Sequence, residues 1–300
     1  MKENELTALI SGIKHMEIHD GDGLRTTVFF KGCPLRCVWC HNPESISYVP
    51  QTALFQSKCI GCGSCSDVCP TGAVTLNENK AIMDHDRCSH CFSCVDECPV
   101  EALVGFGREY TVDALYREIM AEAPFFQNGR GGVTLSGGEC LTQPDFTAAL
   151  AQKLYESGIS VDIDTCGYVP REVLERIIPY CDTFLFDIKA VDQDIHRRCT
   201  GKDNRLILEN LRYLSEKKCR IEIRYPLVVG LNDCECEAIA ELLRGMQGVV
   251  GIKVLRYHNL AASRYHALGM TNTLPPPLTT EEDLSRACDI FRRSGIPVKA

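Results

Sequence analysis

The 300-residue sequence lacks a long apolar run near its start and lacks a block of basic residues anywhere. Charged residues interrupt the first twenty positions, so this segment contains neither the roughly 7–15-residue apolar core of a signal peptide nor a membrane span. The formal net charge is −8, whereas proteins that bind nucleic acid usually concentrate positive charge. The sequence therefore predicts a cytoplasmic protein that binds neither membranes nor nucleic acid.

The sequence also lacks a Ser/His/Asp or paired-carboxylate constellation and a phosphate-binding loop. Thr200-Gly201-Lys202 is similar to the end of such a loop. However, His196 stands where a glycine is required, and Asp203 follows the lysine. The chemistry of this protein must therefore reside in other residues.

Cysteine is abundant instead. Nineteen cysteines are far too many for an average cytosolic enzyme, and in a reducing compartment they are metal ligands more often than disulfides. Eleven of them lie between Cys33 and Cys98 at short, regular spacings. The other eight are scattered, and a free cysteine commonly packs as a small buried hydrophobe; they are Cys140, Cys166, Cys181, Cys199, Cys219, Cys234, Cys236 and Cys288.

Outside the cysteine-dense region, short apolar runs alternate with helical patterns. We expect strands at 26–32, 132–136, 160–165, 183–189, 220–229 and 251–257, and helices at 112–120, 145–158, 171–181, 204–218, 236–246 and 281–295. The last helix follows a Thr280…Asp283 capping-box signal. Such alternation predicts a parallel α/β sheet. Six units are too few for a full eight-fold barrel, which needs about 250 residues. The predicted fold is a partial (β/α)6 TIM-type barrel, with ligands at the carboxyl ends of its strands.

Residues 51–105 differ from the rest and contain two similar halves, KCIGCGSCSDVCPTGAV and RCSHCFSCVDECPVEAL. We expect a ferredoxin-like domain inserted after the first strand, so that residues 1–50 and 106–300 form the barrel. Each half reads C-x2-C-x2-C-x3-C-P, the bacterial run that binds two [4Fe–4S] clusters, with the fourth ligand contributed by the other half.

The two predicted ligand sets are Cys59, Cys62, Cys65 and Cys98 for one cluster, and Cys88, Cys91, Cys94 and Cys69 for the other. Pro70 and Pro99 turn the chain after the last ligand of each half. A pair of zinc sites is the alternative, because zinc also uses paired C-x2-C. The third cysteine and the proline in both halves favour iron–sulfur clusters.

A third cysteine motif, Cys33-x3-Cys37-x2-Cys40, follows the first predicted strand. Three thiolates can hold three irons of a cube and leave the fourth iron without a protein ligand. An open coordination position is what makes a metal centre catalytic.

This motif, with Trp39 and His41 beside its last cysteine, resembles the radical S-adenosylmethionine (SAM) superfamily. The resemblance implies that the open iron chelates SAM, and that electron transfer into the sulfonium releases a 5′-deoxyadenosyl radical. The protein would then poise the cluster, orient SAM and exclude water.

Further segments resemble the glycyl-radical-enzyme activases within that superfamily. HDGDGLR is similar to their D-G-P-G-x-R signature, and SGGE to the G-G-E motif that binds the SAM amino group. DTCG, DIK, HRRCTGKDN with Asn210, RYP and YHN also align. The resemblance implies SAM contacts by Trp39, His41, Gly137, Gly138, Glu139, Asp164, Thr165, Asp187, Lys189, Arg224 and His258. It also places Asp20 and Arg25 toward the partner's glycine loop. Asp22 and Cys140 depart from the pattern, since each stands where proline is commonest.

Each of these residues has a plainer interpretation. Gly137–Gly138 can be an ordinary turn, and Asp164, Asp187 and Lys189 can be polar ends of strands. Arg224 can bridge carboxylates, and His258 can be a satisfied core histidine.

The resemblance implies an activase that carries three [4Fe–4S] clusters, cleaves SAM reductively and abstracts a hydrogen from a glycine Cα of a large glycyl radical enzyme. Flavodoxin or ferredoxin is the expected reductant. The first alternative is a radical SAM enzyme that modifies another peptide or a small molecule. The second is an electron-transfer ferredoxin with a fused scaffold, which leaves the Cys33–Cys40 loop without a purpose.

Overall fold

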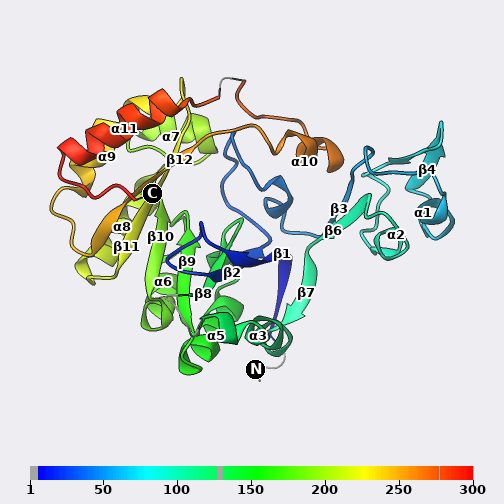
Figure 1. The fold of residues 1–300 in the computed structure, drawn as a ribbon, viewed down its shortest axis with the longest axis horizontal. Helices are drawn as coiled ribbons and strands as arrows, with labels where there is room; N and C mark the ends of the chain where they lie inside the picture. The colour runs from blue at the N-terminus through cyan, green and yellow to red at the C-terminus, as the bar shows by residue number, and fades with distance from the viewer. Residues whose placement is uncertain (1–5, 127–130, 277, 300) are drawn as a thin grey trace.

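The computed structural model describes residues 6–126, 131–276 and 278–299. The fold is α/β, with a main sheet of eight strands in the order β12-β11-β10-β9-β8-β2-β1-β7 (Figure 1). The six parallel strands are β2 (Arg25–Phe30), β8 (Gly132–Gly137), β9 (Ser160–Thr165), β10 (Thr183–Asp187), β11 (Ile221–Leu227) and β12 (Val249–Arg256). Each coincides with a strand expected from the sequence. Buried residues fill these strands because helices and loops cover the sheet.

The sequence did not predict two strands of this sheet. β1 (Thr7–Glu17) pairs antiparallel with both β2 and β7 (Arg108–Thr111). β1 is irregular, with two register shifts within its pairing with β2, and its second half is largely exposed. The charged residues and Gly12 of β1 interrupt the alternation of apolar and polar residues that identifies a strand in a sequence. β1 is therefore recognised as a strand only by its pairing with β2 and β7.

All six expected helices are present. They are α3 (Val112–Met120), α5 (Pro144–Glu156), α6 (Arg171–Ile177), α8 (Arg205–Glu216), α9 (Cys236–Leu243) and α11 (Glu281–Arg293). α6 ends before the expected residue because Pro179 lies in a 3₁₀ turn, Ile178–Tyr180. The predicted capping box of α11 is confirmed, since Thr280 and Asp283 each bind the other's backbone. The structure adds α4 (Ala123–Phe126), α7 (Gln193–Thr200) and α10 (Ala262–Ala267).

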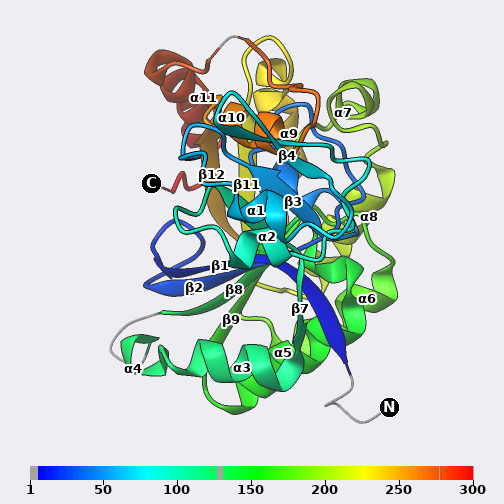
Figure 2. The ribbon, with the colours of Figure 1, turned by 90° about the vertical axis from the view of Figure 1, so that its right-hand side faces the viewer.

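Residues 51–106 contain two small antiparallel pairs and two short helices. β3 (Gln51–Leu54) pairs with β6 (Leu103–Phe106), so the two ends of this segment meet. Between them lie β4 (Val74–Asn77), paired with β5 (Lys80–Met83), and the helices α1 (Ser64–Asp67) and α2 (Ser93–Asp96). The segment projects beyond β7, and a second view shows it in front of the main sheet (Figures 1 and 2). α10 contacts β3 and so connects the segment to the rest of the chain.

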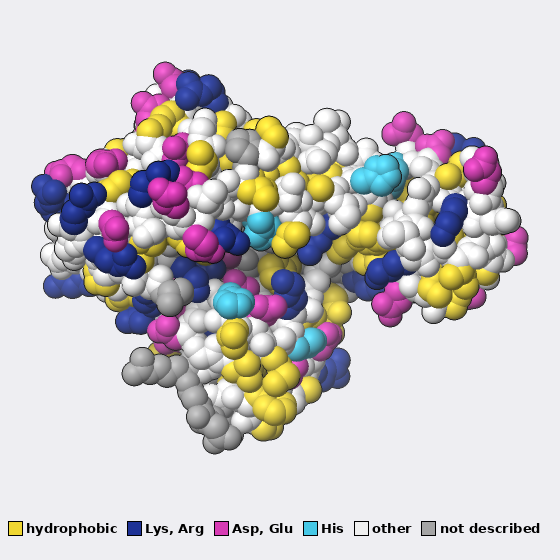
Figure 3. Space-filling view, turned by 45° about the horizontal axis from the view of Figure 1, so that its top comes forward, with side chains coloured by type: hydrophobic (Ala, Val, Ile, Leu, Met, Phe, Trp, Pro, Cys, Tyr) yellow, Lys and Arg dark blue, Asp and Glu magenta, His cyan; other side chains and the backbone are white. Residues whose placement is uncertain are grey.

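The main core packs one face of the central strands, which carries alternate residues such as Val133, Leu135, Val161 and Ile163, against α3, α5, α6, α8, α9 and α11. The 51–106 segment has a small core of its own, which includes Cys59, Cys65 and Cys94. In the space-filling view this segment forms a lobe that stands apart from the main body, and acidic and basic side chains are interspersed over the visible face (Figure 3). Among the described residues, no helix is long and apolar enough to cross a bilayer.

Candidate active site at the carboxyl ends of the strands

The Cys33–Cys40 loop leaves the carboxyl end of β2 and is held by backbone hydrogen bonds. The amides of Arg36 and Val38 donate to carbonyls at the end of α7, at 2.8 and 2.9 Å. The Cys40 amide donates to the Cys37 carbonyl at 3.1 Å, which closes the turn between the two cysteines. From α10, the Tyr265 hydroxyl donates to the Cys40 carbonyl at 3.1 Å. α7 and α10 therefore fix the loop from two sides.

The three cysteines open into a cavity of about 540 Å³ at the carboxyl ends of the parallel strands. This volume lies within the roughly 300–1,000 Å³ of small-molecule sites. Twelve of the predicted site residues line the cavity: Cys33, Cys37, Trp39, Cys40, His41, Gly137, Gly138, Asp164, Asp187, Lys189, Arg224 and His258. These residues come from six separate stretches of the chain, and the parallel sheet brings them together.

Positions 137 and 138 require glycine, because the backbone there packs closely against the segments that precede and follow the cysteine loop. Gly137 has a φ of 117°, and the Gly138 amide donates to the Phe30 carbonyl at 2.9 Å. A Cβ on Gly138 would lie 2.4 Å from the Ser45 carbonyl oxygen and 2.5 Å from that of Gly32. Side chains here would push the end of β8 away from the cysteine loop.

Glu139 and Thr165 lie beside the cavity but do not line it. The Glu139 carboxylate is 1% exposed and accepts hydrogen bonds from the Thr165 hydroxyl at 2.9 Å, the Cys166 amide at 2.8 Å and the Leu141 amide at 3.1 Å. Burial raises the pKa of Glu139, although these donors oppose the shift. The carboxylate joins the ends of β8 and β9, and its role as a SAM contact stays a prediction.

Acidic and basic side chains both border the cavity. Burial raises the pKa of Asp164 to about 7, while Arg224 opposes the shift. Ser136 donates a hydrogen bond to Asp164 at 2.6 Å. Burial would lower the pKa of Lys189, but Asp187, 2.9 Å away, raises it well above its usual value. The cavity therefore offers both acidic and basic groups to a polar, zwitterionic ligand.

The cysteine loop fits an iron–sulfur cluster. Burial raises the pKa of Cys37, and raises that of Cys40 to about 12. The neighbouring Lys189 ammonium favours the thiolate form of both. Only thiolates bind iron, and the positive irons of a cluster would offset the cost of burying their charge.

An aromatic stack closes one side of the cavity. The rings of His41 and His258 lie 4.2 Å apart with an interplanar angle of 4°, and Tyr257 stacks on His41 at 5.8 Å. His41 bonds the His258 carbonyl through Nε2 at 2.8 Å, and burial lowers its pKa. His258 borders the cavity and is not a core histidine.

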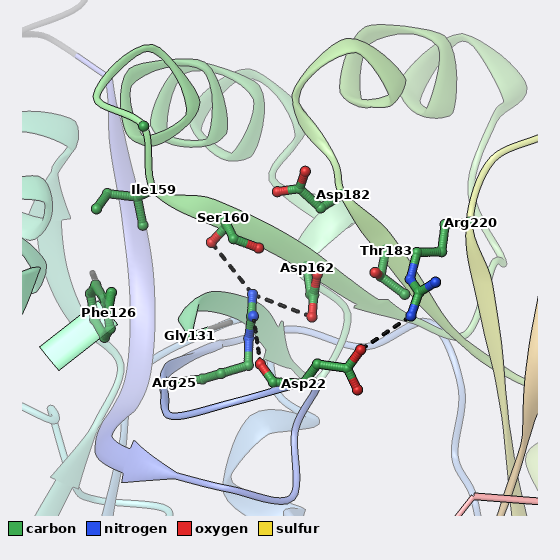
Figure 4. Close-up of a pocket in the computed structure, with 11 residues that line it drawn as sticks. Asp22, Arg25, Phe126, Gly131, Ile159, Ser160, Asp162, Asp182, Thr183 and Arg220 are labelled. Carbon is green, nitrogen blue, oxygen red and sulfur yellow. Dashed lines mark hydrogen bonds and ion pairs between the residues drawn. The ribbon is translucent and has the colours of Figure 1, made fainter. Parts of the chain in front are cut away.

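The turn between β1 and β2 divides two cavities, and this arrangement corrects one expectation. Asp20 lines the cysteine cavity. Arg25 instead lies in a second cavity, at the opposite end of the strands (Figure 4). It is 1% exposed, pairs with Asp162 at 3.3 Å and donates to Thr134 at 2.7 Å. The expectation that Arg25 faces a partner is wrong, because its guanidinium is buried and makes its ion pair and hydrogen bonds within the protein.

Asp22, which replaces the usual proline of this turn, is held by ion pairs. Its carboxylate lies 3.1 Å from Arg220 and 3.5 Å from Lys299. Burial opposes ionisation of Asp22, but these two cations lower its pKa. These ion pairs therefore hold the turn in place, whereas a proline would restrain it through its own fixed backbone angle.

Sequence reasoning missed Cys166 and Lys253 of the cavity lining. Cys166 was counted among the scattered thiols, although it lies inside the DTCG motif. Lys253 has no motif around it, and only the pairing of β12 with β11 places it beside Arg224.

The two halves of the 51–106 segment share one backbone conformation. Gly61 and Gly63 have φ values of 75° and 89°, and the matching His90 and Phe92 have 54° and 65°. The left-handed conformation thus recurs where the second half has no glycine, which indicates a constraint common to both loops. Cys65 and Cys94 occupy matching buried positions in α1 and α2.

The predicted ligand sets also come together in space. Cys59, Cys62, Cys65 and Cys98 line one small apolar cavity. Burial raises the pKa of Cys94 to about 11, and the nearby thiols of Cys88 and Cys69 contribute to the shift. Among the described residues, no three His, Cys, Asp or Glu side chains converge as a mononuclear metal site requires. A cube needs no such convergence, because each of its irons takes one thiolate.

Comparisons with known proteins agree with this geometry. The family described as the radical SAM superfamily matches residues 85–243, more than half of the chain, although the match begins after Cys40. A 4Fe-4S dicluster domain matches residues 58–102, which favours iron–sulfur clusters over zinc. The trans-4-hydroxy-L-proline dehydratase activating enzyme of Clostridioides difficile is 44% identical over 87% of each chain. The choline trimethylamine-lyase activating enzyme of Oleidesulfovibrio alaskensis is 39% identical over 98% of each chain.

The chain belongs to the radical SAM activating enzymes of glycyl radical enzymes. This activating enzyme uses SAM and iron–sulfur clusters to generate a glycyl radical on a partner enzyme. The two alternative functions considered from the sequence are therefore set aside. Among solved structures, QueE from Escherichia coli has a TM-score of 0.51 at 12% identity, covering 99% of this chain and 94% of that one, and shows the shared fold.

Proposed function

We propose that this activating enzyme holds three [4Fe–4S] clusters and that Cys33, Cys37 and Cys40 bind the one at which SAM is cleaved. The observation that carries the proposal is the convergence of these three thiols with charged strand ends on one cavity of about 540 Å³. Three thiolates leave one iron of a cube free to chelate the SAM amino and carboxylate groups. The chain's own residues orient SAM and exclude water from the radical.

Within the cavity, Gly137 and Gly138 would leave backbone room for the methionine part of SAM, and Glu139 and Thr165 would hold that backbone in place. Asp187 and Lys189 would supply charges of opposite sign around the ligand, and Asp164 would be a further acidic group. Other SAM contacts would come from Trp39, His41, Arg224 and His258, which border the same cavity.

We propose that the six parallel strands form a partial (β/α)6 TIM-type barrel, and that residues 51–105 form a ferredoxin-like domain inserted into residues 1–50 and 106–300. Pairing of β3 with β6 at the two ends of this insert supports the boundaries. Cys59, Cys62, Cys65 and Cys98 would hold one cluster, and Cys88, Cys91, Cys94 and Cys69 the other. Both would be fully ligated and unable to bind SAM.

The protein substrate would be a large glycyl radical enzyme, and flavodoxin or ferredoxin would supply the electron. Relatives of 44% and 39% identity are named for trans-4-hydroxy-L-proline dehydratase and choline trimethylamine-lyase, which makes these two enzymes the first partners to test. We also propose a cytoplasmic location, where such reductants act.

The test is SAM cleavage by the anaerobically reconstituted protein with dithionite. The wild type should contain about twelve irons and release 5′-deoxyadenosine and methionine. Replacing Cys33, Cys37 and Cys40 with alanine should leave about eight irons and abolish cleavage. Cys140→Ala is the matched control, because this buried thiol is absent from the cavity lining and should keep full iron and cleavage. Cleavage that survives in the triple variant contradicts the proposal.

A further inference from the structure

Lys253 on β12 is a cation of the active-site cavity to which the proposed function gives no role. It is half-buried and lines the same cavity of about 540 Å³ as the cysteine loop. Strand register pairs Lys253 with Arg224 and Arg224 with Asp187, and all three line the cavity. They therefore form one row across three neighbouring strands, and Lys253 ends the row on the last strand of the sheet.

Lys253 differs from two other cations of this cavity because it has no carboxylate partner. Lys189 lies 2.9 Å from Asp187, and Arg224 lies 3.3 Å from Asp20. Within the described part of the chain, Lys253 forms no ion pair and no side-chain hydrogen bond. Its ammonium therefore has donors that the fold does not use.

The carboxylates around Lys253 are already bound by other cations. Glu222 lies 2.6 Å from Lys299 and 3.6 Å from Arg224, and Asp20 is paired with the same arginine. Burial and the neighbouring Arg224 lower the pKa of Lys253, while Glu222 and Asp20 oppose the shift. The Lys253 ammonium is thus free to bind an acceptor that enters the cavity from outside.

Lys253 lies away from the place that the proposed function gives to SAM. Four residues further along the chain, Tyr257 stacks on His41 at the end of the cysteine loop. At the usual rise of a strand, Lys253 is about 13 Å along the chain from that contact. It borders instead the part of the cavity beside the turn between β1 and β2, which Arg224 joins to β11. This part remains for the second reactant, the segment of the partner that contains its glycine.

A peptide segment that enters such a cavity exchanges water for protein around its carbonyl oxygens. A carbonyl that loses water without gaining a donor costs free energy, and an ammonium offers three donors on a flexible stem. Every glycine-containing segment has backbone carbonyls, whatever its side chains. A carbonyl is therefore the acceptor that the chemistry of Lys253 fits.

We propose that Lys253 is a binding residue for the protein substrate, and that it donates a hydrogen bond to a backbone carbonyl beside the partner's glycine. The inference rests on the proposed function, which places SAM at Cys33, Cys37 and Cys40. Lys253 helps to hold the glycine Cα in position for hydrogen abstraction.

The test uses the full-length, reconstituted enzyme with SAM, dithionite and trans-4-hydroxy-L-proline dehydratase as the partner. The initial growth of the glycyl radical doublet is followed by paramagnetic resonance at several partner concentrations. Lys253→Met should lower kcat/KM for the partner about tenfold, chiefly through a higher KM, as expected for one lost charge-assisted hydrogen bond. Lys253→Arg keeps a cationic donor and should be about threefold better than the methionine variant.

Two controls isolate the effect. Lys217→Met removes an exposed lysine that lies over the Tyr213 ring and should leave kcat/KM for the partner unchanged. Release of 5′-deoxyadenosine without the partner, and the KM for SAM, should be the same in every variant. If Lys253→Met does not assemble its clusters, Lys253→Ala removes the same donor without adding an apolar chain to the cavity.

The outcomes separate this inference from the proposed function. An unchanged kcat/KM for the partner in the methionine or alanine variant overturns the inference and leaves the proposed function standing. A matching fall in partner-free SAM cleavage also overturns it, because Lys253 then acts on SAM. Equal losses in the arginine and methionine variants overturn it as well, because they indicate altered packing. A wild type that does not cleave SAM would instead defeat the proposed function.

Discussion

Arg224 on β11 forms an ion pair with Asp20 of the turn between β1 and β2, with 3.3 Å between Nη1 and Oδ1. The same guanidinium donates to the His19 carbonyl at 3.0 Å. Glu222 lies 3.6 Å from its Nε, and burial opposes the charge while Asp164 and Asp20 stabilise it and raise the pKa of Arg224. One arginine therefore holds the turn across the cavity and compensates several carboxylates at once.

Removing that charge should destabilise the protein strongly. Arg224→Met should lower the free energy of unfolding by about 3 kcal/mol, because buried carboxylates lose their partner. Arg244→Met is the control, since Arg244 pairs with Glu241 on the surface and both side chains are about two-thirds exposed. Such a pair contributes about 1 kcal/mol or less. Denaturant titration under anaerobic conditions measures the free energy of unfolding of both variants. Equal losses of stability in the two variants would contradict the assigned role of Arg224.

Gly138→Ala should damage the cysteine loop. The added methyl group would lie far inside contact distance of two backbone oxygens, those of Ser45 and Gly32. Overpacking of this kind costs about 1–3 kcal/mol. We expect iron content to fall by about four atoms as the SAM-binding cluster is lost. Gly12→Ala is the matched control, because nothing lies within 4 Å of its added carbon. Retention of all iron and of SAM cleavage in Gly138→Ala speaks against this account.

Stability should depend on pH through Asp164. Its pKa rises from an ordinary 3.8 to about 7 in the folded protein, chiefly through burial. Between these values the folded state binds more protons than the unfolded state, so this group's stabilising contribution is complete below pH 4 and disappears as pH rises to 7. The slope is at most ~1.4 kcal/mol per pH unit. Asp164→Asn should flatten the unfolding free energy between pH 5 and 7, and an unaltered slope contradicts this role.

The clusters of the insert should be needed for glycyl radical formation on the partner, but they should not be needed for assembly of the SAM-binding cluster. Disrupting both insert clusters with Cys62→Ala and Cys91→Ala should leave the Cys33–Cys40 cluster assembled, because those two cysteines are exposed and far along the insert from its ends. Glycyl radical formation on the partner, measured as its paramagnetic resonance doublet, should nonetheless fall. Cys234→Ala, another exposed thiol, serves as the control.

A different pattern would identify a structural role. If the insert clusters only hold together a segment with little core of its own, the double variant should lose circular dichroism and the catalytic cluster together. A soluble double variant with an undiminished partner radical would exclude both electron relay and docking by the insert.

The sequence by itself determined the features that depend on local spacing. Three cysteines within eight positions, and two repeats of four, predict cluster ligands from their spacing alone. The six parallel strands and six helices follow from hydrophobic periodicity, and the Thr280–Asp283 capping box from three-residue spacing. Each of these signals is complete within a short segment, so no long-range contact is needed to recognise it.

Only the tertiary structure decided the features that depend on pairing between distant segments. It placed β1 and β7 as antiparallel strands, and it turned Arg25 away from the cavity that Asp20 lines. It also set Glu139 between the ends of two strands and brought Cys166 into the cavity that the cysteine loop enters. A side chain's direction at the end of a strand depends on the register with its neighbours, because a shift of one residue reverses the face. That register is fixed by pairing between strands that lie from about twenty to more than a hundred residues apart in the chain, which no local pattern records.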